Sequence, residues 1–323
     1  MPCYKPLTGW RAEKPNPSGK YGLVFQKPTG SAAHSQKSIE IPCGRCIGCR
    51  LEYSRQWALR CSHEAHMHDE NCFITLTYAD TTELFTEPND DDLYGLKKRH
   101  WQLFLKKLRK QLHPKKIRFF MCGEYGEEFG RPHFHAIIFG WYPPHRDKYG
   151  ELDLTPVREN KNGDVIYDSK MLSKIWGHGF VSVGDVTFES AAYVARYVTK
   201  KITGEDAEEH YKHFNPLTGE VINLQPEFTL SSRRPGIAKT WFDKYNKDLE
   251  KGFITSRGIK MQAAKYYDNE LEKINPSVYK ELKKTRTKMA IEQKAKGETT
   301  RERLDVKEFI KRKKLTLLPR DKA

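Results

Sequence analysis

Two short apolar segments separated by a glycine-containing turn constrain the fold of this chain more than any other feature. They are IRFFMCGEYG (117–126) and RPHFHAIIFGW (131–141), and the turn lies at about residues 127–130. Aromatic and β-branched residues are typical of strands, and a short connection joins antiparallel neighbours. The sequence therefore predicts a β-hairpin within an antiparallel sheet.

Helices and further strands are predicted on both sides of this hairpin. Apolar residues three or four positions apart predict helices at about 51–68, 96–112 and 190–201. Strand-like composition predicts strands at 72–80 and 179–188, and a stretch rich in Pro, Asp, Lys and Asn predicts an insert at 142–170. Because helices and strands alternate irregularly, we predict an α+β fold with a central antiparallel sheet and flanking helices.

Three regions are expected along the 323 residues. Residues 1–50 are predicted to be an N-terminal loop region with a cysteine cluster, and residues 51–205 to carry the sheet and its chemistry. Residues 206–323 are predicted to be a basic, mainly helical C-terminal region. A chain of this length forms one large domain or two ordinary ones.

The charge of the chain indicates a polyanionic partner. Its net charge is +15, and residues 251–323 hold 21 basic and 10 acidic residues, or +11 of that total. No long apolar stretch accompanies this charge, so nucleic acid matches it better than a membrane does. A solvated helical surface is the alternative for the tail. The N-terminus lacks the pattern of a secretory signal, and an odd number of cysteines, seven, favours a reducing compartment.

Two histidines occupy alternate positions on the second strand of the hairpin. Side chains two residues apart on a strand share a face, so His133 and His135 are expected to project together. The antiparallel return is expected to bring Glu124 beside them. Two imidazoles and a carboxylate leave open positions on a divalent ion of the Mn, Mg or Fe class, and such an ion polarises a phosphoryl oxygen. The alternatives are histidines that only form hydrogen bonds on the sheet, and a solvated glutamate.

A candidate nucleophile follows in the segment SAAYVARYVTKK. Tyr193 and Tyr197 are four residues apart, so on a helix they share a face and are able to reach one phosphate in turn. Tyrosine forms covalent intermediates, and the cations Lys200 and Lys201 are placed to orient DNA or to stabilise a leaving oxygen. Tyrosines that only pack against the core are the alternative.

A cysteine cluster precedes the first long helix. Cys43, Cys46 and Cys49 are each three residues apart, and Cys3 is able to complete a set of four thiolates. Four thiolates are a common ligand set for a structural Zn²⁺ ion. Reduced free thiols are the alternative.

Basic residues near the predicted sheet are candidates for DNA contact. Lys106 and Lys110 lie opposite the apolar stripe of the helix at 96–112, where phosphate contact would be independent of base sequence. Arg131 directly precedes the histidine strand, where it is placed to contact the scissile DNA strand or to lie in the turn.

Several motifs in order give the chain a family resemblance. FITLTY (73–78), HFH (133–135) and YVARY (193–197) with the following lysines resemble the rolling-circle replication initiators of the HUH endonuclease superfamily. Together with CGRCIGCR and CGEYGEEFGRPHFHAIIFGW, they look like the initiators of gokushovirus-type microviruses. The resemblance covers roughly residues 40–205, with a weaker similarity at SSRRPGI (231–237).

This resemblance implies a fold, a reaction and a setting. The fold would be a sheet of about five antiparallel strands with the metal site on its central strands. A tyrosine would attack single-stranded origin DNA with the help of Mg²⁺ or Mn²⁺, leaving a 5′-phosphotyrosine link and a free 3′-OH for host DNA polymerase to extend. The second tyrosine would cut after one round, in the host bacterial cytoplasm. Because the chain carries no Walker A helicase motif, a host helicase is expected to separate the strands.

Two other functions are compatible with parts of this pattern. A transposase or conjugative relaxase would share the histidine pair and a tyrosine, although the paired tyrosines favour a replication initiator. A non-catalytic zinc-containing nucleic-acid-binding protein would use the cysteines and the basic tail only. Covalent attachment of Tyr193 or Tyr197 to DNA distinguishes the enzyme from such a binding protein.

Overall fold

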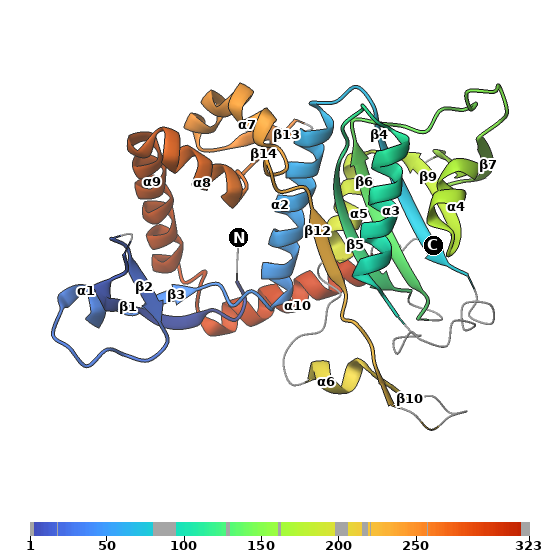
Figure 1. Ribbon diagram of the computed structural model, residues 1–323. Coiled ribbons are helices and arrows are strands. Elements are labelled where there is room, and N and C mark those ends of the chain that lie inside the picture. Colours follow the sequence, from blue (N-terminus) through green and yellow to red (C-terminus); the bar gives the residue numbers. More distant parts are fainter. Residues whose placement is uncertain are drawn as a thin grey trace. The chain divides into compact units, whose positions relative to one another are not determined.

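The protein divides into two compact units, one of which is built from both ends of the chain. In the computed structural model (Figure 1) the described residues are 3–17, 19–79, 95–126, 130–160, 163–197, 206–214, 219, 221–256 and 258–317. The first unit comprises residues 1–53 and 280–323, and the second comprises residues 54–279.

The second unit is organised around one antiparallel sheet of seven strands in the order β12-β5-β6-β4-β9-β8-β7. In chain order the strands are β4 (Asn71–Tyr78), β5 (Arg118–Tyr125), β6 (Pro132–Phe139), β7 (Leu154–Glu159), β8 (Val165–Ser169), β9 (Gly179–Asp185) and β12 (Phe228–Ser231). The predicted hairpin is formed by β5 and β6, and β4 pairs with β6 on its other side. The α+β class with a central antiparallel sheet is therefore confirmed.

The sheet has more strands than the family resemblance implies, seven instead of about five. Strands β7 and β8 form a hairpin inside the segment that the sequence predicted to be an insert. In β7 only Leu154 is buried, so the alternation of apolar and polar residues that marks a half-buried strand is missing there. Composition alone therefore hid this hairpin.

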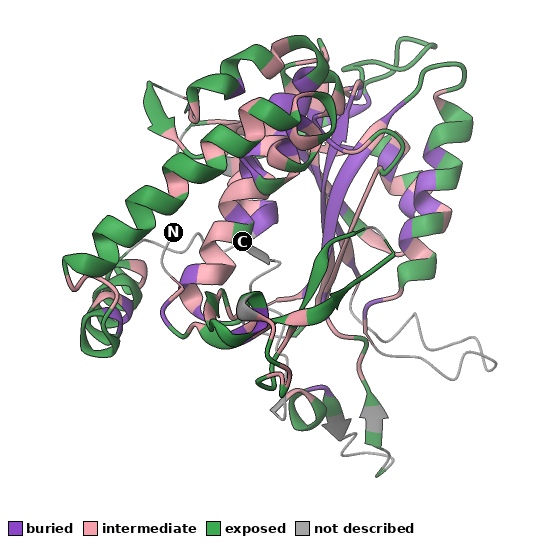
Figure 2. Cartoon of the chain, turned by 90° about the vertical axis from the view of Figure 1, so that its left-hand side faces the viewer, coloured by how far each residue is buried: buried purple, intermediate pink, exposed green. Residues whose placement is uncertain are grey.

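One face of the sheet forms the main hydrophobic core of this unit. Strand β4 alternates strictly between buried and half-buried residues, and Ile74 and Leu76 point into the core. Helices α3 (Lys98–Gln111) and α4 (Lys170–Trp176) cover this face. The ring of Phe134 lies edge-on to that of Trp176, with centroids 5.7 Å apart. Buried residues are concentrated in the large sheet (Figure 2), and each large apolar side chain removed from water contributes roughly 1.5–3 kcal/mol.

The opposite face of the sheet carries His133 and His135 and is covered by other helices. Trp57, from helix α2 (Ile47–Ala65), stacks on Phe120 of β5 with ring centroids 4.5 Å apart. Helix α5 (Phe188–Tyr197) packs on β5 and β6, and its buried residues include Ala191, Val194 and Ala195. The histidine face is therefore partly enclosed by helices.

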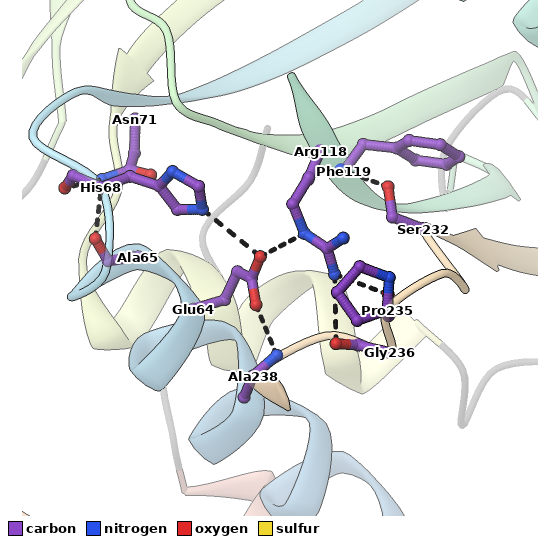
Figure 3. Close-up of polar contacts among 10 residues, drawn as sticks. All are labelled: Glu64, Ala65, His68, Asn71, Arg118, Phe119, Ser232, Pro235, Gly236 and Ala238. Carbon is purple, nitrogen blue, oxygen red and sulfur yellow. Dashed lines mark hydrogen bonds and ion pairs between the residues drawn. The ribbon is translucent and has the colours of Figure 1, made fainter. Parts of the chain in front are cut away.

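A buried carboxylate joins three distant segments of the second unit (Figure 3). Glu64 on α2 forms an ion pair with Arg118 on β5, and it accepts hydrogen bonds from His68 and from the backbone N–H of Ala238. Arg118 also donates to the carbonyl oxygen of Gly236 at 3.1 Å. Burial alone would raise the pKa of Glu64, but the hydrogen bonds and the charge of Arg118 outweigh it and hold that pKa below 4.5. The carboxylate therefore fixes the segment that follows SSRRPGI.

The remaining elements of the second unit are short apart from α8. They are α6 (Asp206–His210), β10 (Lys212–Phe214), β11 (Val221–Asn223), α7 (Lys239–Tyr245), η1 (Asn246–Lys251), β13 (Ile254–Ser256), β14 (Ile259–Met261) and α8 (Lys265–Ile274). Strands β10 and β11 form one separate hairpin, and β13 and β14 form another.

The first unit combines a small sheet with the last two helices. Its elements are β1 (Leu7–Pro15), β2 (Tyr21–Val24), α1 (Ala33–Gln36), β3 (Ile39–Ile41), the start of α2, most of α9 (Pro276–Ala295) and α10 (Arg301–Thr316). The sheet has the order β2-β1-β3. The helical character predicted for the basic C-terminus is confirmed. Within the described ranges, no helix combines the length and apolar character needed to cross a bilayer.

Candidate metal and nucleophile site

Strands β5 and β6 bring a carboxylate and an imidazole into direct contact. Glu124 is the register partner of His133, and His135 lies two residues further along the same face of β6. Oε1 of Glu124 lies 2.8 Å from Nε2 of His135. Both side chains are almost fully buried, with 3% and 4% exposed. The structure therefore places the three residues that the sequence singled out as metal ligands on one face of the sheet.

Two threonines on β4 hold the imidazoles from the other side. The register pairs Thr75 with His135 and Thr77 with His133. In each pair the threonine hydroxyl lies 3.0 Å from Nδ1 of the histidine. Both rings therefore reach from β4 toward β5, with Nδ1 at the threonine. Nε2 of each ring is left on the side of β5.

A glycine directly after β5 makes room for the first imidazole. A Cβ atom at Gly126 would lie 2.9 Å from Nε2 of His133, closer than real Cβ contacts come. The backbone N–H of Gly126 donates to the carbonyl oxygen of Arg131 at 2.9 Å, which closes the hairpin at this point. The donor set of two imidazole nitrogens and a carboxylate oxygen fits a divalent ion with open coordination positions.

Helix α5 places one candidate nucleophile beside this donor set. The ring of Tyr193 meets that of His135 edge-on, with centroids 5.4 Å apart and planes at 84°. It also meets Phe73 edge-on, with centroids 6.2 Å apart. Tyr193 is half-buried, and its helix is anchored by the fully buried Val194 on the next position. The hydroxyl-bearing ring is therefore held against the histidine face.

The other catalytic candidates lie beyond what the structure describes. Tyr197 is the last residue of α5, so its backbone continues the helix one turn after Tyr193, but its side chain lies outside the described part. Lys200 and Lys201 also lie outside the described residues.

The candidate DNA-contact residues are not gathered at the histidine site. Lys106 and Lys110 are exposed on α3, which packs on the face opposite to the histidines. The structure therefore does not bring them to the candidate metal site. Arg131 is half-buried and lies two residues before His133, so it is the one of the three that is close to that site along the chain.

The four predicted zinc ligands come together in the first unit. The sulfur atoms of Cys3, Cys43, Cys46 and Cys49 all lie within 4.8 Å of one another. Sγ of Cys3 is 3.9 Å from Sγ of Cys46. With Zn–S bonds of about 2.3 Å, two sulfurs of a tetrahedral site are roughly 3.8 Å apart, so the cluster has the size of a zinc site.

Backbone N–H groups support these sulfurs. The N–H of Tyr4 donates to Cys46 at 3.3 Å, that of Cys43 donates to Cys3 at 3.2 Å, and that of Cys46 donates to Cys43 at 3.3 Å. Burial acts to raise the pKa of Cys46, but N–H donors, among them those of Cys49 and Tyr4, outweigh it and lower that pKa to about 7. The surroundings of Cys46 therefore favour a thiolate.

Sequence reasoning missed the threonines and the glycine of the histidine site. Thr75 and Thr77 have the same alternate spacing as the histidines, and this spacing was the signal available in the sequence. Which residues of β6 they face depends on the register between strands about sixty residues apart. That register comes from the tertiary structure.

Comparisons with known proteins relate the chain to phage replication. Residues 71–202 match the family described as replication-associated protein ORF2/G2P, a range that contains β4, β5, β6 and α5. The replication-associated protein VP4 of Bdellovibrio phage phiMH2K is 28% identical over 296 residues, which cover 86% of this chain and 84% of that protein. The replication-associated protein ORF2 of Spiroplasma virus 4 is 31% identical over 242 residues, which cover 72% of this chain and 68% of that protein. No solved structure matches the chain.

Proposed function

The chain belongs to the family of phage replication-associated proteins described as ORF2/G2P, and from this premise we propose that it nicks and rejoins single-stranded phage DNA at the origin, starting rolling-circle replication. The observation that carries the proposal is the contact of His135 with Glu124 on one side and with the ring of Tyr193 on the other. A carboxylate, an imidazole pair and a tyrosine on one face match metal-assisted phosphoryl transfer.

In this proposal the protein residues divide the work of one transfer reaction. Mg²⁺ or Mn²⁺ held by His133, His135 and Glu124 would polarise the scissile phosphate and offset the charge that builds on it. The Tyr193 hydroxyl attacks the phosphorus and loses its proton, and the bond from phosphorus to the 3′ oxygen breaks. The 3′ oxygen takes up a proton and leaves as a free hydroxyl. The 5′-phosphotyrosine link keeps the bond energy, so attack by a 3′-OH rejoins DNA without ATP.

The second tyrosine and the lysines have roles in the same proposal. Tyr197 attacks the regenerated origin after one round, so the two tyrosines alternate and release a unit-length circle. Lys200 and Lys201 orient the DNA or stabilise the leaving oxygen. Arg131 contacts the scissile strand. Lys106 and Lys110, on the other side of the sheet, bind DNA phosphates outside the reaction site.

Thr75 and Thr77 act as positioning residues in this proposal. A hydroxyl both donates and accepts, so each threonine is able to satisfy Nδ1 whether or not that nitrogen carries a proton. For Nε2 to bind a metal, Nδ1 must carry the proton, and the threonine oxygen then accepts from it. The threonines therefore fix the ring orientation and permit the tautomer that metal binding requires.

We further propose a structural Zn²⁺ ion on the four cysteines, a host helicase and DNA polymerase as partners, and the host bacterial cytoplasm as the site of action. We also propose that the chain divides by function at residues 50 and 205, with the nicking chemistry in residues 51–205. A tetrahedral set of four thiolates is one of the closed arrangements typical of structural zinc.

A covalent-adduct assay tests the nicking function. Purified protein is mixed with end-labelled single-stranded DNA from the phage genome and Mg²⁺ or Mn²⁺, and the label is followed through a denaturing gel. The proposal predicts a protein-bound label that disappears with EDTA, with His135→Ala and with the double variant Tyr193→Phe/Tyr197→Phe. Tight DNA binding without an adduct on any genome segment would instead favour a non-catalytic zinc-containing nucleic-acid-binding protein.

A further inference from the structure

The unit built from the two chain ends has a very small hydrophobic core. Among its described residues the buried apolar side chains are Tyr4, Cys46 and Leu304. The partly buried hydrophobic residues packed against them are Cys3, Cys43, Ile47 and Cys49. A core of this size does not stabilise a unit that spans residues 1–53 and 280–323, and small folds of this kind depend on disulfides or a metal.

The cysteine cluster is the centre of this core and includes no disulfide. All seven cysteines of the chain are free thiols. Cys46 is one of the three buried residues, and the other three cysteines of the cluster, with Ile47, are the partly buried residues packed against them. These free thiols are therefore the groups through which an ion would close the unit.

Tyr4 connects the cluster to the last helix. Its backbone N–H donates to Sγ of Cys46 at 3.3 Å, and its carbonyl oxygen accepts from Nη1 of Arg301 at 3.4 Å. Its side chain packs in the same cluster as Leu304 on α10. Cys3, the residue before Tyr4, is one of the four thiols. An ion that fixes Cys3 therefore also fixes the surface on which α10 docks.

A further contact between the chain ends is weak. Lys294 on α9 lies 3.9 Å from Glu40 on β3, with 71% and 56% of the side chains exposed. An exposed ion pair at this distance contributes little to stability. The docking of α10 around Tyr4 is therefore a firmer connection between the chain ends than this exposed pair.

The start of α2 is suited to the charge that four thiolates would bring. Cys46 precedes the first residue of α2 and Cys49 lies in its first turn. The unpaired N–H groups at a helix N-terminus stabilise negative charge, and they lower the cost of ionising a thiol. Zn²⁺ binding then releases the thiol protons to solvent, and the remaining charge lies against the helix end.

We propose that a Zn²⁺ ion on Cys3, Cys43, Cys46 and Cys49 is the clamp that folds the first unit, so that its removal releases residues 280–323 while residues 54–279 stay folded. This inference rests on the zinc site proposed above. The second unit has its own extensive core, which contains none of the four cysteines.

The test uses the full-length protein with Mg²⁺ in excess and a zinc-selective chelator, so that the histidine site keeps its supply of metal. Zinc is counted by elemental analysis, and Co²⁺ substitution reports tetrahedral thiolate binding by visible absorption. Hydrogen exchange followed by mass spectrometry then compares the untreated protein with the protein treated with the chelator. We expect one zinc per chain and a loss of protection on chelation of about tenfold or more in α10 and β1, with β4, β5 and β6 unchanged.

Variants separate the effect of the cysteine cluster from that of the exposed ion pair. Cys49→Ser and Cys3→Ser should reproduce the effect of chelation, and Lys294→Ala, which removes only the exposed pair, should leave exchange unchanged. The chelator experiment on the wild-type protein remains informative if a cysteine variant fails to fold.

Each remaining outcome decides against part of the idea. If the wild-type protein contains no zinc and Cys49→Ser exchanges hydrogen as the wild type does, both the zinc site and the clamp are wrong. Zinc that is removed without loss of protection in α10 overturns the clamp alone, and so does chelation that opens both units together. The adduct assay on the same samples reports the nicking function independently.

Discussion

Glu124 and His135 lie on neighbouring strands of the sheet and are joined through Oε1 and Nε2 at 2.8 Å, where both side chains are almost inaccessible to solvent. A buried carboxylate beside an imidazole is costly unless it is paired or binds a metal. The pair is therefore the most informative place to test the proposed ion.

Replacing Glu124 by Gln keeps the size of the side chain but removes its charge. We expect the affinity for Mn²⁺ to fall by about 10–100-fold or more, because a carboxylate oxygen is exchanged for a weaker amide ligand. Titration calorimetry with Mn²⁺ measures the effect. Glu151→Gln, on an exposed residue, is the matched control, and equal affinities for the two variants would remove Glu124 from the ligand set.

Replacing Thr75 or Thr77 by Val keeps the side-chain shape and the strand preference but removes the hydroxyl. We expect metal affinity to fall by about 10–100-fold, the range seen for residues that orient a ligand. Thr→Ser at the same positions should restore it. The ¹⁵N chemical shifts of the two imidazoles should report a changed tautomer in the Val variants, a signal that a purely structural role would leave in place.

A control for these variants is available on an exposed strand. Thr155→Val on β7 makes the same chemical change away from the histidines. Unchanged metal affinity and tautomer in Thr75→Val and Thr77→Val would show that the hydroxyls have no positioning role.

Tyr193→Phe removes one oxygen while keeping the ring that contacts His135 and Phe73. We therefore expect thermal stability to stay close to wild type and adducts at position 193 to be lost. Mass spectrometry of nuclease-treated peptides identifies the modified tyrosine. If wild-type adducts are found only on Tyr197, the assignment of Tyr193 as a nucleophile is wrong.

Glu64→Gln leaves Arg118 without its buried partner. Breaking a buried ion pair from one side costs about 3–5 kcal/mol of unfolding free energy, which urea unfolding measures. Glu70→Gln is the matched control, because the pair of Glu70 with Lys115 is about half exposed and is worth roughly 0–1 kcal/mol.

The pH dependence of stability gives Glu64 a second signature. Its pKa is lowered in the folded state, so the unfolded chain binds the proton more readily. The carboxylate therefore stabilises the fold above the unfolded pKa, near 4.5, and this contribution is lost as the pH falls through the lower folded pKa. The stability difference between wild type and Glu64→Gln should shrink in that acidic range. A difference independent of pH there would contradict this account.

Local periodicity allowed the histidine strand to be predicted from the sequence. Alternation places His133 and His135 on one face of the strand. Because the turn is short, most possible registers of the hairpin bring Glu124 close to them. The resemblance to phage replication initiators, based on ordered motifs, is confirmed by the family membership. The α+β class followed from the same local patterns.

Features that depend on distant pairing were not predictable in this way. The partnership of Thr75 with His135 requires the register of β4 against β6, which no local pattern encodes. Neither β7, which is mostly exposed, nor β8, which is mostly half-buried, alternates between buried and exposed residues. The contact of Tyr4 with Arg301 joins residues 297 positions apart, and only the folded chain brings them together.

Because the first unit contains residues from both ends of the chain, the two units fold in a fixed order during synthesis. Residues 54–279 leave the ribosome as one continuous segment, so the sheet with the histidines is able to fold while the chain is still growing. The thiols of residues 3–49 are made before this segment and α10 is made after it, so the thiols wait for α10. A truncated chain that stops before α10 would therefore keep an intact histidine sheet and leave its own first residues without the helix that covers them.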